Sequence, residues 1–150
     1  MHGQHNHFRL TWNELYDTAS GSTTAASSTK PLTPRQFIDT GLRFISQLTL
    51  HHSVEELYIF PRLSERMPAF QDNDELKTHH KKIHEGMDAL EAYLKGCKSG
   101  ERDLRMEEVR TLMDTWREVL WTHLDREVEE LGAENMRKYW TLEEMRRMPM

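Results

Sequence analysis

The chain has 150 residues, a formal net charge of −5 and a single cysteine. This length suits one domain with a buried core, and one cysteine excludes an intrachain disulfide, so we expect a reducing, cytoplasmic environment. Acidic and basic residues are interspersed, which argues against the basic face of a nucleic-acid-binding protein. Because there is no apolar run of about 18 residues and no apolar N-terminal segment, we expect neither a membrane span nor a signal peptide.

The first predicted element is a helix over residues 4–19. Its side chains repeat at intervals of three and four residues, as on the buried face of a helix. This stripe consists of His5, Phe8, Trp12, Leu15 and Ala19. The segment 20–32 that follows is rich in serine, threonine and alanine, and is predicted to be a flexible surface loop.

A second helix is predicted to begin after Thr33. Pro34 stands at the first helical position and Gln36 completes a capping box. The helix should extend to about residue 66, with Pro61 bending it or ending it early. Its core stripe is expected to include Phe37, Gly41, Phe44, Ile45, Leu48 and Ile59.

Two further helices and a tail complete the chain. The third helix is predicted to start after Asp72 or Asn73 and to end near residues 96–100. The fourth covers roughly 103–131, with Gly132 as the glycine that commonly follows a helix end. The tail 133–150 is amphiphilic and basic, and is compatible with a short capping helix. The sequence therefore predicts an all-α protein, an antiparallel up-down four-helix bundle over 1–132 with a C-terminal extension over 133–150.

Histidine and glutamate side chains fall at metal-binding spacings on these helices. Pairs four residues apart share one helix face, about one turn apart. The pairs are His51 with Glu55 or, one residue later, His52 with Glu56; His80 with His84; and His123 with Glu127; His5 lies on the stripe of the first helix. The helical wheel leaves the choice between the two pairs of the second helix open, and its centre lies nearer His52. The pair that does not bind metal is expected to lie at the surface or beside a metal ligand. In the second case its carboxylate would orient the imidazole of that ligand.

The size of this donor set favours two metal ions. Five imidazoles and two carboxylates are too many for one ion, since a zinc site usually closes with four ligands. Imidazole suits iron, zinc and copper, whereas carboxylates can bridge harder ions. Two ferrous ions balanced by two carboxylates and a bridging hydroxide would leave the buried site nearly neutral. The ferritin-like alternative needs two Glu-x-x-His motifs, and no glutamate lies three residues before a histidine in this sequence.

These motifs resemble the hemerythrin-like (HHE cation-binding) family. The resemblance spans His5 to Leu131 and rests on four pieces of sequence. They are His5-Asn6, the run from His51 to Glu56 with Phe60-Pro61 after it, His80-Lys81-Lys82-Ile83-His84-Glu85, and His123-Leu124-Asp125-Arg126-Glu127. The resemblance implies a four-helix bundle with a non-haem di-iron centre, bridged by an oxo or hydroxo group, that binds dioxygen reversibly.

The resemblance also implies a role for each residue. It selects His51 and Glu55 over His52 and Glu56 on the second helix. One iron would be held by His80, His84 and His123, the other by His5 and His51, with Glu55 and Glu127 bridging; Leu120 would line the dioxygen pocket. The invertebrate oxygen carriers of this family look like they use an aspartate five residues after the last histidine, where this chain has Val128. In this respect the chain resembles the regulatory and microbial branches of the family more than the carriers.

Two other functions are compatible with the same donors. One is a di-iron enzyme of the peroxidase, catalase-like or oxidase type, for which the sequence offers Tyr16, Tyr58 and Glu56 as proton donors. The other is an iron-responsive sensor or storage protein, because metal binding is coupled to folding when the metal-free site buries polar groups. In every case the expected partner is a small ligand such as dioxygen or peroxide, rather than nucleic acid or a membrane.

Overall fold

A computed structural model describes residues 2–21, 32–70 and 74–148 of the chain, without the side chains of residues 2–5, 69, 74–76 and 133–134. The described part is helical throughout and contains no strand, which confirms the all-α prediction. None of the helices in this part is long and apolar enough to cross a membrane. Most of the predicted loop 20–32 and the cap candidates Asp72 and Asn73 lie outside the described residues.

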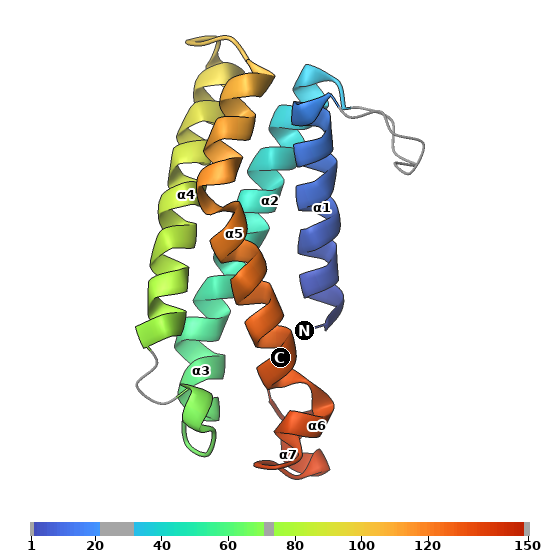
Figure 1. Ribbon diagram of the computed structural model, residues 1–150, viewed down its shortest axis with the longest axis vertical. Helices are drawn as coiled ribbons and strands as arrows, with labels where there is room; N and C mark the ends of the chain where they lie inside the picture. The colour runs from blue at the N-terminus through green and yellow to red at the C-terminus, as the bar shows by residue number, and fades with distance from the viewer. Residues whose placement is uncertain (1, 22–31, 71–73, 149–150) are drawn as a thin grey trace.

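Four long helices lie side by side (Figure 1). They are α1 (His2–Ser20), α2 (Pro34–Val54), α4 (Asp74–Ser99) and α5 (Met106–Leu131). Helix α1 packs against α2 and α5, and α4 packs against the same two helices, so the four surround one interior. Followed by colour in Figure 1, successive long helices run in opposite directions.

The second predicted helix begins as expected but changes character before its end. The Thr33 hydroxyl accepts a hydrogen bond from the Gln36 backbone N–H at 3.2 Å, and the Gln36 side chain accepts one from the Thr33 N–H at 3.0 Å. This confirms the capping box. At the other end α2 gives way to a π-helix, η1 (Glu55–Ile59), followed by the short α3 (Phe60–Leu63). Pro61 lies in the first turn of α3, where its missing N–H is tolerated.

The C-terminal tail folds back on the end of α3. After α5 come α6 (Ala133–Met136) and α7 (Leu142–Arg146), while the 3-10 turn η2 (Pro68–Phe70) lies beyond α3. Gly132 does end α5, but in an extended conformation (φ −61°, ψ 144°) rather than the left-handed one that usually selects glycine. The Arg66 guanidinium binds the Glu144 carboxylate at 2.9 Å and stacks over the Trp140 ring. The tail therefore covers an apolar surface.

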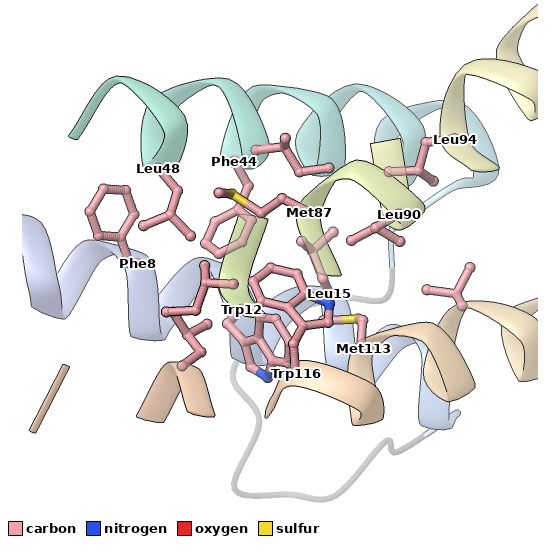
Figure 2. Close-up of a cluster of buried hydrophobic side chains, with 14 of the residues drawn as sticks. Phe8, Trp12, Leu15, Phe44, Leu48, Met87, Leu90, Leu94, Met113 and Trp116 are labelled. Atoms are coloured by element: carbon pink, nitrogen blue, oxygen red, sulfur yellow. The ribbon is translucent and has the colours of Figure 1, made fainter. Parts of the chain in front are cut away.

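Two apolar clusters fill the interior at successive levels. The larger cluster joins all four long helices, and Figure 2 shows Trp12 against Trp116 near its middle. These two rings meet edge to face with centroids 4.8 Å apart. The smaller cluster lies under the tail and contains Ile59, Leu63, Met67, Phe70, Leu131, Met136 and Trp140. Between the two clusters, α2, α4 and α5 place polar side chains.

Gly86 lets α4 and α5 approach each other closely at the level of Trp116. A Cβ atom at position 86 would overlap the Trp116 side chain. We expect Gly86→Ala to lower the free energy of unfolding by about 1–3 kcal/mol, since overpacking a core outweighs the gain in helix propensity. Urea denaturation measures this. Gly96→Ala on the same helix is the control, because its Cβ meets only the exposed Arg102 side chain and should leave stability unchanged or higher; equal stability of both variants would contradict the packing argument.

Candidate metal centre

Six buried histidine and glutamate side chains meet between the two apolar clusters. They are His51, His52 and Glu55 from α2 and η1, His80 from α4, and His123 and Glu127 from α5; each is at most 8% exposed. On α2 they follow Leu48 of the larger cluster and precede Ile59 of the smaller one. A polar layer enclosed on both sides by apolar side chains loses its hydration on folding, so its members need charge or hydrogen-bond compensation from one another or from a ligand.

The donor atoms form two overlapping groups. One atom each from His52, Glu55, His80 and His123 lie within 4.8 Å of one another, and so do atoms from His51, Glu55 and Glu127. Glu55 belongs to both groups, which places a carboxylate between two possible cation positions. Because metal–donor bonds are about 2.0–2.2 Å, donors around one ion stand about 3–4 Å apart. Small side-chain movements would therefore suffice to hold a cation in each group.

Facing nitrogen and oxygen atoms mark the centre of this layer. The Nε2 atoms of His80 and His123 lie 3.0 Å apart, and His123 Nε2 lies 2.5 Å from Glu127 Oε1. His51 Nε2 lies 3.0 Å from Glu55 Oε1. The His80–His123 contact thus joins α4 and α5, and each carboxylate lies against the histidine four residues before it, so nitrogen and oxygen donors converge where a cation would bind.

A π-turn, η1, lies where the second helix passes from the donor layer to the lower apolar cluster. In η1 the Phe60 N–H bonds to the carbonyl of Glu55, five residues back, instead of four. Glu55 and Ile59 are both buried, whereas the three residues between them are exposed. Such single π-turns inside helices often occur at functional sites. Here the turn lies between Glu55 in the donor layer and Ile59 in the lower apolar cluster.

Burial shifts the pKa of two of the donors, His52 and Glu55, in the absence of a cation. Burial lowers the pKa of His52 well below its ordinary value, and the nearby His80 and His123 lower it further. Burial also raises the pKa of Glu55 well above its ordinary value, and a hydrogen bond with Glu127 adds to this increase. The imidazole is thus kept neutral, the form that binds metals, while the carboxyl group retains a proton that a cation would displace.

These two shifts predict opposite effects of pH on the metal-free protein. Glu55 stays protonated in the folded chain above 4.5, where the unfolded chain releases its proton. Its contribution to stability is therefore present below pH 4.5 and lost as the pH rises toward the folded pKa. The unfolded His52 imidazole takes up a proton below 6.5 but the folded one does not, so its contribution to stability is lost as the pH falls below 6.5.

Glu55→Gln removes the first of these effects. We expect the chelated Glu55→Gln protein to unfold at a higher temperature than the chelated wild type, with the difference growing from pH 5 to pH 8. Thermal melts followed by circular dichroism at several pH values measure the difference. A difference independent of pH would mean that Glu55 is already ionised in the folded metal-free chain.

Glu56 lies outside the layer but touches one of its members. Its Oε1 atom is 2.7 Å from His80 Nδ1, and its side chain is 47% exposed. A carboxylate on the outer nitrogen of an imidazole fixes the ring and leaves the inner nitrogen, Nε2, for a cation. Glu56 therefore occupies the orienting position expected for the outer glutamate.

Two predicted donors are not part of the buried layer as the structure describes it: His84 is partly exposed, and the side chain of His5 is not among the described side chains. The side chain of His84 is 37% exposed, and its Nε2 is 3.9 Å from Glu56 Oε1 rather than in either donor group. The backbone of His5 belongs to α1, but its side chain is outside the described residues. One turn later, the Phe8 ring meets the His51 ring at 5.2 Å, so this end of α1 lies beside the layer. Leu120 is buried on α5, one turn before His123.

His51 and His52, which the helical wheel presents as alternatives, are both buried in the fold. The helical wheel indicated that His52 could be buried, because the centre of the apolar face lies near this residue. Nothing in the sequence indicated the π-turn.

A family profile described as the hemerythrin HHE cation binding domain matches residues 1–134. This chain belongs to that family. Among curated proteins and solved structures, none matches it closely enough to count as a relative. A hemerythrin domain implies a bound metal cation, and the donor layer fits one: two ring nitrogens face each other at 3.0 Å, and a buried carboxyl group is shared by two donor groups.

Proposed function

We propose that this hemerythrin-family protein is an antiparallel up-down bundle, spanning residues 1–132, that holds two non-haem iron ions and binds dioxygen reversibly. The observation that carries the proposal is the sharing of buried Glu55 between two donor groups. A carboxylate in that place would be suited to hold both cations, as carboxylates do in other two-metal sites. The segment 133–150 would then be an extension that covers the end of the bundle.

The chemistry of the donors favours iron over harder or softer ions. The layer contains four imidazoles and two carboxylates and no thiolate, since the lone Cys97 lies elsewhere, on α4. Calcium and magnesium prefer oxygen alone, whereas mixed nitrogen and oxygen donors suit iron, with zinc and copper as competitors. When bound, a pair of iron ions supplies the reversible electron transfer that dioxygen binding requires.

The residues of the chain would supply the enclosure that reversible binding needs. Leu120 and Leu124 are buried on α5 beside His123, and they exclude water from that side of the layer. An apolar wall suits an uncharged diatomic ligand, and it also limits proton leakage that would make ligand release irreversible. The orienting contact of Glu56 with His80 holds the imidazole in one tautomer.

Optical spectroscopy under controlled gas tests the proposal. Iron-loaded, reduced protein should gain a visible charge-transfer absorption on exposure to air and lose it when dioxygen is removed. The same protein loaded with zinc is the control, because zinc undergoes no redox change. An iron-loaded protein whose spectrum never responds to air, or responds only irreversibly, would rule out reversible dioxygen binding.

A di-iron peroxidase or catalase-like enzyme is the second candidate, and the position of Glu56 favours it. Peroxide reduction consumes protons, and a partly exposed carboxylate that contacts buried His80 offers a route from solvent to the layer. Tyr16 is committed instead to a hydrogen bond with Asp114. Turnover of hydrogen peroxide by the iron-loaded protein, reduced about 10–100-fold in Glu56→Gln, would support an enzyme over a carrier. An iron-responsive sensor remains a third proposal, tested by the stability measurement described in the Discussion.

A further inference from the structure

His52 is enclosed without hydrogen bonds. Its side chain is 0% exposed, and neither Nδ1 nor Nε2 has a hydrogen-bond partner. The ring is stacked on His80 at a centroid distance of 4.1 Å and an interplanar angle of 11°, and it meets the His123 ring edge-on at 5.5 Å. A buried imidazole normally bonds to a carbonyl, a carboxylate or water, because an unpaired buried polar group is costly.

His84 has the opposite environment. Its side chain is 37% exposed, so water can hydrate its ring. Its ring is edge-on to His52 at 5.7 Å, on the outer side of the layer beside Glu56. Within the described residues it belongs to neither donor group. Water can therefore hydrogen-bond to the ring of His84, whereas neither ring nitrogen of His52 has a hydrogen-bond partner.

We infer that His52, and not His84, is the third imidazole ligand of the cation held by His80 and His123. One ring nitrogen of His52 already lies within 4.8 Å of donor atoms of those two residues and of Glu55. A cation there would give the unpaired nitrogen a partner. This inference rests on the proposed metal centre, but it changes the ligand set that the family resemblance implies for the chain.

The assignment predicts two changes of opposite sign in one variant. His52→Phe keeps a ring of similar size against His80 but removes both unpaired nitrogens. The metal-free variant should therefore unfold at a temperature higher than the metal-free wild type, by about 2–8 °C. The same variant should gain less stability from iron and retain about one iron per chain instead of two. A residue with only a structural role in packing would not produce this combination.

The experiment compares His52→Phe and His52→Gln with His84→Gln. Iron per chain is measured by elemental analysis after anaerobic loading and gel filtration, and melting is measured with and without iron. We expect both His52 variants to lose about one iron, and His84→Gln to keep the iron content and affinity of the wild type within about twofold. The glutamine variant at position 52 separates loss of a ligand from any effect of an added apolar ring.

Two results would overturn the inference, and they are distinguishable from failure of the proposed function. If wild type binds two irons and His52→Phe and His52→Gln bind two equally well, His52 is not a ligand. If His84→Gln loses an iron while the His52 variants do not, His84 is the ligand after all. A wild type that binds no iron at all would remove both the proposed centre and this assignment.

Discussion

Glu55→Gln is expected to abolish high-affinity binding of both cations. Glu55 is the one residue that belongs to both donor groups within the described part of the chain, and its side chain is fully buried. An uncharged amide neither bridges two cations nor neutralises them, so affinity should fall more than the 10–100-fold that is typical of losing an outer partner of a ligand. Metal competition with a calibrated chelator measures the loss.

Glu129→Gln provides the matched control for this substitution. It makes the same chemical change at an exposed position of α5, two residues after Glu127. It should leave both the number of bound ions and their affinity unchanged. If Glu55→Gln still bound two ions with an affinity close to that of the wild type, Glu55 would not bridge them.

Removing the metal is expected to produce the largest change in stability. The layer contains six buried polar side chains that a pair of cations would neutralise and hold together. At free iron 1,000-fold above the dissociation constant, one bound ion adds about 4 kcal/mol to the free energy of unfolding. For a chain of this size each kcal/mol corresponds to about 2–4 °C, so loading should raise the melting temperature by about 10 °C or more.

Melting of chelated and iron-loaded protein, followed by circular dichroism at 222 nm, measures this difference. The helical signal before melting is equally informative. A large gain of helix on loading would favour the iron-sensor function, since the fold would then depend on the ion. Equal helix content and equal melting temperatures in the two forms would contradict the idea that cations organise the layer.

Much of the fold followed from local sequence signals. The Thr33 capping box and the apolar stripes placed the helices because each depends on residues three or four apart on one segment. The buried pair His123 and Glu127 could be anticipated for the same reason: both continue the inward stripe of α5 that passes through Trp116 and Leu120. Periodicity is reliable where a helix remains regular and one face is covered by its neighbours.

The second helix shows where such reasoning fails. His51 and His52 both lie in the regular part of α2, before the π-turn, and are about 100° apart around the helix. Both are buried because Phe8 of α1 covers the His51 ring and His80 of α4 stacks on the His52 ring, which a wheel of one helix does not show. No local sequence signal predicted the π-turn after Val54. The α4 helix poses a related problem: His84 has the four-residue spacing of the buried pairs His51–Glu55 and His123–Glu127, yet its side chain is 37% exposed. The side chain stacked on His80 in the interior is instead His52 of α2. The conformation of Gly132 likewise depends on how the tail packs, which its sequence does not specify.

The tail illustrates a contact that only tertiary structure reveals. Trp140 is buried beneath Arg62 and Arg66, which approach its ring at 4.9 and 4.4 Å. The arginines come from and just beyond α3, more than 70 residues earlier in the chain. The basic residues Arg137, Lys138, Arg146 and Arg147 remain exposed. The sequence predicts an amphiphilic tail but contains no signal that the tail packs against α3.

Anaerobic titration of the metal-free protein with ferrous iron, followed by calorimetry, tests the central claim most directly. The account predicts saturation at two irons per chain, with proton release as Glu55 gives up its proton, and loss of both binding events in Glu55→Gln. Absence of tight binding, or binding that Glu55→Gln leaves intact, would contradict the claim that this buried layer exists to hold a pair of cations.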